Sequence, residues 1–188
     1  MKIILIRHFK VNFRWKFAYN SDGFEKACDD YDSSNIICTN FKERTNELVI
    51  SSTMFRAIET TKIIFNKPPD ISSDLLREVP IKPFIKTNII LPTIIWNIIG
   101  RIQWRLGSKI QPETYFESQL RINNFIDIII TKKENCIIVA HGWIIKLIIR
   151  KLIKEKFRGV NPIYIRTGFK YEYINKAQAP NNAYKIKR

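Results

Sequence analysis

The sequence has two histidines, and each of them follows a short run of apolar residues. His8 comes after the run Ile3–Ile6 and Arg7, and His141 comes after the run Cys136–Ala140. Such runs are typical of strands that are buried on both faces of a parallel sheet. In open sheets of this kind, ligands bind beyond the carboxyl ends of the strands. The sequence therefore predicts two histidines side by side at one sheet edge, where they could take part in catalysis.

Three more polar residues are expected at the same edge because they also follow apolar runs: Ser52, Arg56 and Glu78. With Arg7, the edge would then hold two guanidinium groups around the two histidines. A guanidinium group matches the oxygens of a phosphate in a bidentate way. A single histidine after a strand is more often structural than catalytic, but two histidines with two arginines favour a phosphate pocket.

Strand-like runs and helical apolar faces alternate along the chain, which predicts an α/β fold with a largely parallel sheet. After the first run, strands are expected at 47–51, 75–79 and 136–140, with an edge strand at 171–174. Helices are expected at about 21–30, capped by Ser21 or Asp22, and at 53–65, 92–106, 113–131 and 143–156. The polar stretch 31–46 has no clear period and is expected to form a loop.

Cationic residues flank the expected site in two segments that interrupt this alternation. Lys10 and Arg14 lie in the segment 9–19, where aromatic residues alternate with others, as in an extended loop or ribbon. Arg101 lies in the segment 80–112, which is expected to be a cap-like insertion. All three could bind a second anionic group on a substrate. Selectivity for the substrate is expected to reside in these two segments.

The helix at 92–106 has an apolar face and a polar face. The apolar face consists of Ile95, Ile98, Ile99, Ile102 and Leu106, and the opposite face of Asn97, Arg101 and Arg105. We favour an ordinary surface helix that packs its apolar face on the core. Alternatively, it is a cap that leans over the active edge and offers its arginines to the substrate. A third interpretation is a helix that lies on a membrane surface.

Composition narrows the class of partner. The 188 residues carry a net charge of +15, and 45% of them are hydrophobic, an ordinary share for one globular domain. A basic chain can bind nucleic acid, a membrane surface or a small anion, but codon bias can also enrich lysine. No nucleic-acid signature is visible, so no such partner is expected. We expect one domain at 1–176 and a basic flexible tail at 177–188.

The cysteines and apolar runs indicate a cytoplasmic protein. Cys28, Cys38 and Cys136 are odd in number and lack metal-like spacing, which is typical of reduced thiols in a cytoplasm. The first apolar run ends at Arg7 after four residues, too early for a signal peptide. The run 89–99 is too short to span a bilayer. No stable membrane insertion is therefore expected.

Five motifs in this order resemble those of the histidine phosphatase superfamily, the phosphoglycerate-mutase-like proteins. They cover about residues 1–152. The first is a strand followed by Arg-His, and the second is Ser-x-x-x-Arg-Ala-x-x-Thr, matched here by Arg7-His8 and by Ser52, Arg56, Ala57 and Thr60. The others are Leu76-Arg77-Glu78, Pro112-Glu113-Thr114 with Arg121, and Val139-Ala140-His141-Gly142. Three residues depart from the pattern: Phe9 replaces a glycine, Lys10 an acidic or small residue, and Lys146 a common arginine.

The resemblance implies a three-layer α/β/α sandwich and a phosphatase rather than a mutase, because the fuller opening motif and longer chain of the mutases are absent. It implies that His8 is the nucleophile and that Arg7, Arg56 and His141 hold the phosphoryl group. The two arginines would disfavour a charged His8 and keep its lone pair available. Glu78 would act as the general acid and base, unless it is only a surface carboxylate paired with Arg77.

The expected substrate is a small phosphorylated metabolite, and neither a metal nor another cofactor is expected, because cationic side chains would stabilise the transferred group. The main alternative is a non-catalytic protein on the same fold that binds or senses a phosphorylated ligand. A basic nucleic-acid-binding protein is a further alternative that no motif supports.

Overall fold

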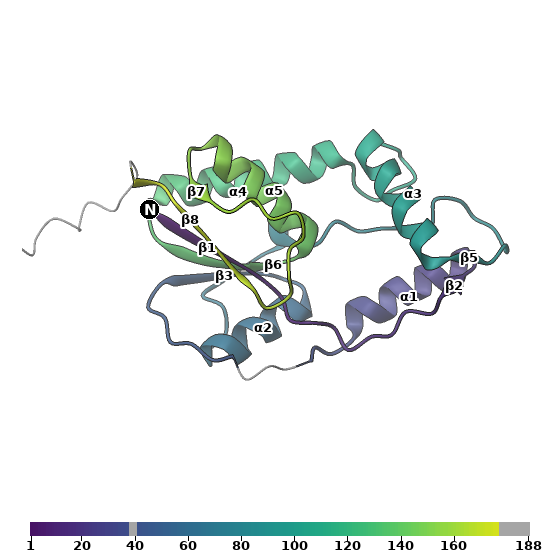
Figure 1. Ribbon diagram of the computed structural model, residues 1–188, viewed down its shortest axis with the longest axis horizontal. Coiled ribbons are helices and arrows are strands. Elements are labelled where there is room, and N and C mark those ends of the chain that lie inside the picture. Colours follow the sequence, from purple (N-terminus) through teal and green to yellow (C-terminus); the bar gives the residue numbers. More distant parts are fainter. Residues whose placement is uncertain (38–40, 177–188) are drawn as a thin grey trace, which may run out of the picture.

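The computed structural model describes residues 1–37 and 41–176, and its centre is a six-stranded sheet (Figure 1). The strand order is β4-β3-β6-β1-β8-β7. These strands are β1 (Lys2–Arg7), β3 (Leu48–Ser52), β4 (Ile71–Ser73), β6 (Cys136–Ala140), β7 (Arg158–Gly159) and β8 (Lys170–Ile174). β4, β3, β6 and β1 pair in parallel, whereas β8 is antiparallel to both of its neighbours. Arg7 pairs with Ala140, so the two histidines follow directly from adjacent strand ends.

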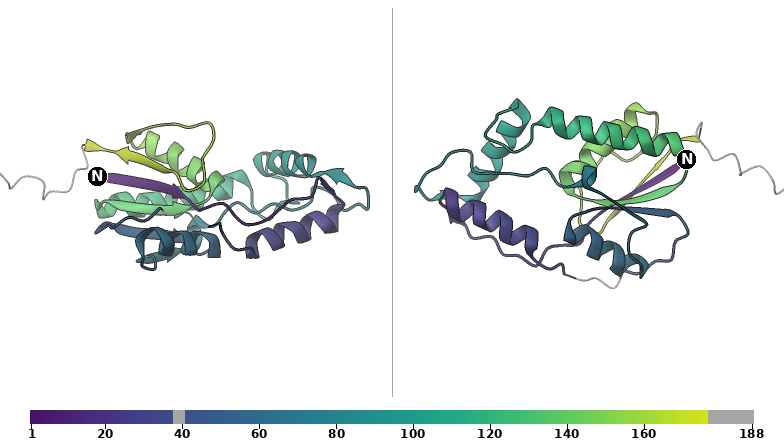
Figure 2. Two further views of the ribbon diagram at one scale, coloured as in Figure 1. Left: turned by 60° about the horizontal axis from the view of Figure 1, so that its bottom comes forward. Right: turned by 180° about the vertical axis from the view of Figure 1, so that it is seen from behind.

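Helices cover both faces of the sheet because successive side chains of a strand point to opposite faces. Ile3 and Leu5 pack with residues of α4 (Tyr115–Lys132) and α5 (Gly142–Lys154) in one core cluster. Ile4 and Ile6 pack with residues of α2 (Phe55–Phe65) in a second cluster. Figure 2 shows these layers on either side of the strands. The predicted three-layer sandwich with a mostly parallel sheet is confirmed.

The remaining elements form a cap beyond the carboxyl ends of the parallel strands (Figure 1). The cap consists of β2 (Ala18–Tyr19), α1 (Ser21–Ser33), β5 (Leu91–Pro92) and α3 (Thr93–Leu106), and β2 pairs antiparallel with β5. The Trp96 ring stacks on Phe24 with their centroids 5.6 Å apart, and its Nε1 donates to the carbonyl of Tyr19 at 3.0 Å. The cap therefore has an aromatic core of its own.

The helix α3 exists as predicted, but the favoured interpretation of its faces is wrong. Its buried residues are Trp96, Gly100 and Trp104, while Ile98 and Ile102 are exposed. Large indole rings remove more surface from water than isoleucines do, and Gly100 lets Ile81 approach closely: a Cβ there would be 2.8 Å from Ile81 Cδ1. The helix belongs to the cap, with Ile94, Ile98 and Ile102 toward solvent and Ile95 and Ile99 half-buried.

Three other predictions about elements differ from the structure. The strand expected at 75–79 lies earlier, as β4, and a 3-10 turn η1 (Asp74–Leu76) follows it because this turn buries Leu76. β8 is not an edge strand, since the two-residue β7, too short to show a period, pairs outside it. α1 continues to Ser33, and its N-cap is Asn20, which accepts from the backbone of Gly23.

Most of the segment 9–19 is extended without regular pairing, and β2 is its only strand. The tail expected at 177–188 lies outside the described residues. Within the described ranges, no helix has both the length and the apolar character needed to cross a membrane.

Candidate active site

His8 leaves the end of β1 with one ring nitrogen already bound to the protein. Its Nδ1 lies 2.7 Å from the carbonyl oxygen of Phe9. A carbonyl can only accept a hydrogen bond, so Nδ1 carries the proton and Nε2 keeps a free lone pair. The backbone N–H of His8 donates to Ala140 at 3.0 Å, which ties this residue to the neighbouring strand. The tautomer and the position of His8 are therefore set by backbone groups.

Burial holds His8 in its neutral form. The side chain is 2% exposed, and burial lowers the pKa of His8 to about 3, with a smaller contribution from the charge of Arg56. The hydrogen bond to Phe9 raises this pKa slightly, and Arg7 lowers it further. The sequence analysis attributed the neutral state to the arginines alone; the loss of solvation is the larger cause.

His141 and Ser52 lie behind the arginine of the second motif. The two histidine rings are 5.0 Å apart between centroids. Arg56 Nε donates to His141 Nδ1 at 3.2 Å, so the proton of this ring is on Nε2, which lies 2.9 Å from Ser52 Oγ. Ser52 Oγ also accepts from the backbone of Met54. Burial, followed by the charges around it, lowers the pKa of His141 well below its ordinary value, so the ring is neutral.

Arg7 approaches the site over the backbone of Gly142. A Cβ at Gly142 would lie 3.3 Å from the guanidinium carbon of Arg7, so a side chain there would crowd it. Arg7 Nη1 donates to the carbonyl of Ile165 at 2.6 Å. Its buried Nε has no hydrogen-bond partner among the described residues. This N–H can therefore donate a hydrogen bond to an anion's oxygen without breaking an existing bond.

The Glu78 carboxylate stands on a short irregular segment after η1. Its Oε1 accepts from the backbone of Val79 at 3.0 Å, and its Oε2 from the backbone of Trp143 at 3.4 Å. Arg101 reaches from α3 and donates through both terminal nitrogens to the carbonyl of Val79, at 3.1 and 3.2 Å. Burial lowers the pKa of Arg101, and the Glu78 charge partly offsets this effect. Through Arg101, the cap thus holds Val79, the residue that follows Glu78.

The Glu113–Arg121 pair from the fourth motif contacts the segment before Glu78 from the side of the sheet. Arg121 Nε and Nη2 bind the two oxygens of Glu113 at 2.6 and 2.9 Å, and both side chains are buried. Arg121 Nη1 donates to the carbonyl of Leu75 in η1 at 2.5 Å. A buried bidentate pair has a fixed geometry. The Glu113–Arg121 pair therefore supports the start of the Glu78 segment and does not line the cavity, whereas Pro112 of the same motif does.

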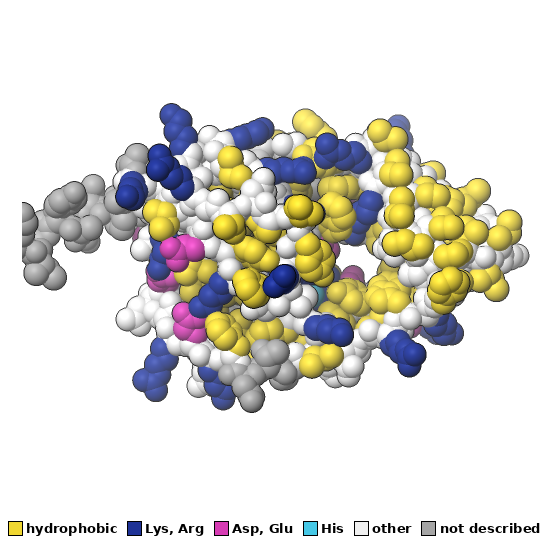
Figure 3. All heavy atoms as spheres, viewed as in Figure 1, with side chains coloured by type: hydrophobic (Ala, Val, Ile, Leu, Met, Phe, Trp, Pro, Cys, Tyr) yellow, Lys and Arg dark blue, Asp and Glu magenta, His cyan; other side chains and the backbone are white. Residues whose placement is uncertain are grey.

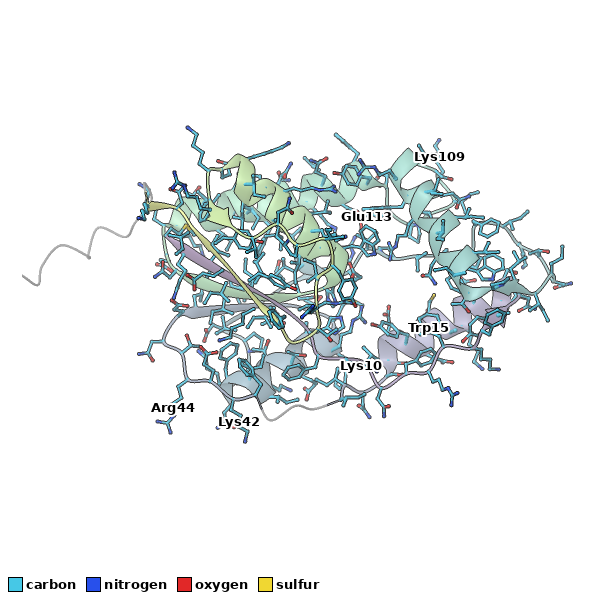
Figure 4. All side chains as sticks on the ribbon, viewed as in Figure 1. Lys10, Trp15, Lys42, Arg44, Lys109 and Glu113 are labelled. Carbon is cyan, nitrogen blue, oxygen red and sulfur yellow. The ribbon has the colours of Figure 1, made fainter. Side chains whose placement is uncertain are left out.

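Arg7, His8, Arg56, Glu78 and Arg101 line one cavity of about 720 Å³ between the strand ends and the cap. Figure 3 shows the opening, with a histidine side chain at its edge. Other predicted site residues do not line it. Ser52 and His141 are fully buried behind Arg56. Lys10 and Arg14 are exposed and lie outside it, Lys10 on the stretch that leads to the cap (Figure 4).

The cap contributes residues that the sequence analysis missed. Asp32 of α1 binds Arg56 Nη1 at 2.8 Å, and the Arg56 guanidinium carbon lies 5.3 Å from the centre of the Tyr31 ring. Trp15, labelled in Figure 4, packs beside Tyr31 and also lines the cavity. The acidic spacing of α1 (Glu25, Asp29, Asp32) was a usable signal, since residues three and four apart share a helix face.

Phe9 stands where the resembled motif has a glycine, and its side chain does not line the cavity. Its ring is buried in the core cluster under α2, and its N–H donates to Thr60 Oγ1 at 2.9 Å. The ring fits beside Gly168, where a Cβ would lie 3.0 Å from Phe9 Cδ1. Gly168 has a φ of +68°, a conformation that favours glycine. The bulk added at position 9 is thus accommodated by a glycine in another segment.

The arrangement can bind a tetrahedral anion and present a nucleophile to it. A neutral imidazole with a free Nε2 lies beside two guanidinium groups, and a carboxylate stands in the same cavity. Among the described residues, no group of three or more histidine, cysteine or acidic side chains is placed to hold a metal ion.

Solved structures with this fold include several phosphatases. The alpha-ribazole phosphatase from Shigella flexneri is 15% identical with a TM-score of 0.56, and the match covers 95% of this chain and 93% of that chain. A phosphoserine phosphatase variant from Entamoeba histolytica, solved with phosphoserine, is 15% identical with a TM-score of 0.55 and the same coverage. The mycobacterial glucosyl-3-phosphoglycerate phosphatase is 15% identical, with a TM-score of 0.51 and coverage of 81% and 79%.

No family model and no curated protein matches the sequence. The three-dimensional likeness confirms the predicted phosphoglycerate-mutase-like fold.

Proposed function

We propose that this protein is a phosphatase that hydrolyses a small phosphomonoester through a phosphohistidine at His8. The observation that carries the proposal is the free Nε2 of a neutral His8 in a cavity with two arginines. The fold shared with known phosphatases supports the same conclusion. The preferred substrate is a small phosphorylated metabolite of the cytoplasm, since the cavity of about 720 Å³ suits a compact ligand.

In the first step, His8 Nε2 attacks phosphorus while the bond from phosphorus to the leaving oxygen breaks. Arg7 and Arg56 stabilise the negative charge on the three remaining oxygens. Both terminal nitrogens of Arg56 keep a second N–H beyond those that bind Asp32 and Met54. Glu78, in its protonated form, gives its proton to the leaving oxygen, so that an alcohol departs.

In the second step, water attacks the phosphohistidine and the bond between phosphorus and Nε2 breaks. Glu78, now a carboxylate, takes the proton of the attacking water, and phosphate is released. The carboxylate is regenerated as an acid by the same transfer, so the cycle closes. No step needs a redox partner or a second substrate besides water.

We propose that His141 contributes to catalysis mainly by holding Arg56 in position. Both of its ring nitrogens are bound to protein groups, Nδ1 to Arg56 and Nε2 to Ser52. The direct phosphate contact expected from the sequence requires Nε2–H to leave Ser52 and turn to the substrate. In the free enzyme, His141 and Ser52 instead fix the orientation of the Arg56 guanidinium, as positioning residues.

Trapping the intermediate tests the proposal. The protein is mixed with a ³²P-labelled aryl phosphate, quenched in alkali and separated from substrate, since phosphohistidine survives alkali and decays in acid. We expect alkali-stable label on the wild type and neither label nor turnover with His8→Gln, whose circular dichroism stays unchanged. Turnover retained by His8→Gln would overturn the nucleophile. Saturable phosphate binding by a wild type that never turns over would favour the non-catalytic alternative.

A further inference from the structure

The helix α3 and the loop before it carry a continuous apolar surface beside the cavity, and Ile94 at its inner edge also lines that cavity. The proposed catalysis assigns this surface no role. We call it the cap apolar face and define it by Ile89, Ile90, Ile94, Ile98, Ile102 and Leu106. Each of these side chains is more than half exposed, from 51% at Ile102 to 79% at Leu106. Figure 3 shows hydrophobic side chains gathered over α3 and the loop that leads to it. Contiguous apolar surfaces of this kind mark interaction sites.

The apolar side chains on α3 form a stripe along the helix. Ile94, Ile98, Ile102 and Leu106 follow one another at intervals of four residues, which places them on one side. Phe17, 85% exposed, extends the surface, since its carbonyl accepts from the backbone of Thr93 at the start of the helix. The opposite side is buried by Trp96 and Trp104. The helix is thus anchored on one side and uncovered on the other.

The chain segment that carries this face has charges of one sign, whereas the neighbouring α1 is acidic and its Glu25 pairs with Lys82. From Val79 to Pro112 the sequence contains five lysines and arginines and no acidic residue. Lys86 and Lys109 are exposed. In sequence, Lys86 precedes the stripe and Lys109 follows the end of α3 (Figure 4). Neither lysine forms an ion pair with any residue in the described ranges. The segment therefore combines an apolar surface with exposed cations at residues that flank it in sequence.

We propose that the cap apolar face binds reversibly to the surface of an anionic lipid membrane. Helices with an apolar face and cationic flanks lie in the membrane interface, where the apolar side chains enter the acyl boundary and the cations meet anionic headgroups. The net charge of +15 favours the same partner. This binding is peripheral and leaves the cavity mouth, between cap and strand ends, next to the membrane.

A second copy of this chain fits the face less well. Two caps joined through the same surface would bring the same cations together, since a two-fold interface repeats each residue. The segment 79–112 offers no carboxylate to neutralise them. Like charges facing each other across an interface are costly. An anionic lipid surface supplies the missing charge.

Vesicle co-sedimentation tests the proposal with matched variants. Wild type is spun with phosphatidylcholine vesicles and with vesicles that contain phosphatidylserine, at low and high salt. We expect binding to the anionic vesicles that weakens at high salt. Ile98→Ser with Ile102→Ser should lower it roughly tenfold. Leu120→Ser with Ile128→Ser, equally exposed on α4, is the control and should not.

Charge reversal tests whether the lysines near the cap apolar face, and not the overall positive charge of the chain, are responsible for vesicle binding. Lys86→Glu with Lys109→Glu should weaken binding by roughly fivefold or more per site. Lys132→Glu with Lys154→Glu changes the net charge by the same amount at the ends of α4 and α5, away from the cap, and should weaken binding much less. Equal losses from both pairs would overturn the proposal, as would equal binding to neutral vesicles.

Two further readouts complete the test. Hydrolysis of a soluble aryl phosphate should be the same in all four double variants, so membrane binding and catalysis can fail separately. Analytical ultracentrifugation should show the same mass for wild type and for Ile98→Ser with Ile102→Ser. A wild-type dimer that this pair dissociates, with no vesicle binding, would overturn the membrane proposal in favour of self-association.

Discussion

The two walls of the cavity are built in different ways. On the sheet side, the cavity arginines are each held by more than one bond: Arg56 binds His141, Asp32 and Met54, and Arg7 binds the Ile165 carbonyl and the Tyr164 hydroxyl. On the cap side, two of the cations that were expected to meet the substrate, Lys10 and Arg14, are exposed and lie outside the cavity. Arg101 is the exception, since it is fixed to Val79.

For the proposed reaction, this difference predicts which wall contributes more to the rate. Groups that stabilise charge in a transition state contribute most when they are oriented before the reaction begins. Buried, bonded side chains at strand ends meet this condition, whereas a solvated lysine must be ordered at an entropic cost. We therefore expect substitutions on the sheet side to reduce the rate strongly and most substitutions on the cap side to have small effects.

Among the residues that would bind the phosphoryl group, the largest effect is expected for Arg56→Ala. The guanidinium would lie beside both histidines and the transferred phosphoryl group, where an arginine contributes ~10³–10⁵-fold to the rate. We expect a loss of this size in kcat/KM for an aryl phosphate. Arg56→Lys should recover little of it, because a lysine cannot bind His141, Asp32 and a phosphate at once. Recovery by lysine to within tenfold of wild type would show that only the charge matters.

The next effect concerns Glu78 and depends on the leaving group. An alkoxide needs a proton as it departs, whereas a nitrophenolate barely does, and general acid catalysis contributes ~10²–10⁴-fold. We expect Glu78→Gln to reduce hydrolysis of an alkyl phosphate by this factor and of nitrophenyl phosphate far less. The matched control is Glu172→Gln on β8, whose carboxylate lies outside the cavity. If Glu78→Gln reduced the rate equally on both substrates, Glu78 would not be the general acid.

Much of the sheet side could be predicted from the sequence because strand ends place polar residues without any help from distant contacts. The positions of Arg7, His8 and His141 follow from two apolar runs and the parallel pairing. Ser52 was expected near the substrate, but it lies behind His141, a depth that the motif does not encode.

The cap side was harder to predict because tertiary contacts decide it. The isoleucines of α3 match a core stripe by period, yet Trp96 and Trp104 pack inward. Asp32 reaches Arg56 only because α1 lies across the cavity, and no local pattern contains that placement. The pairing of Phe9 with Gly168 likewise joins segments that are far apart in sequence.

A third prediction uses the two neutral histidines, both of which lie on the sheet side. Unfolded histidine has a pKa near 6.5, whereas the folded pKa of His8 is lowered to about 3 and that of His141 is also lowered. Below pH 6.5, His8 and His141 are therefore protonated in the unfolded chain but stay neutral in the folded chain. Stability is fully present above this pH and falls as the pH is lowered, by on the order of 1 kcal/mol per pH unit for each histidine.

Urea unfolding between pH 7.5 and 5.5 measures this effect, since most carboxylates stay ionised in that range. We expect the free energy of unfolding to drop as the pH falls below 6.5. His8→Gln removes one of the two contributions, so its stability should depend less steeply on pH than that of wild type. The same slope in both proteins would mean that His8 is not held neutral by the fold.

The smallest effects separate Arg101 from Arg14, which the sequence analysis treated alike as contacts for a second anionic group. The structure gives them different surroundings. Arg101 donates twice to the carbonyl of Val79, next to Glu78, while Arg14 is exposed and outside the cavity. We expect Arg101→Ala to lower kcat/KM roughly tenfold, the size of one lost charged hydrogen bond, and Arg14→Ala to change it less than twofold.

The reason for the Arg101 effect can be tested by the substrate on which it appears. If Arg101 positions Glu78, its loss should affect alkyl phosphates more than nitrophenyl phosphate and should appear mainly in kcat. Once Glu78 is already Gln, adding Arg101→Ala should cost little more, because the two residues then act as one unit. If Arg101 instead binds a second anionic group, KM should rise for a multiply charged substrate, and the loss should add to that of Glu78→Gln. An equal change in Arg101→Ala and Arg14→Ala would remove the distinction between a cap residue that supports the sheet side and one that only faces solvent.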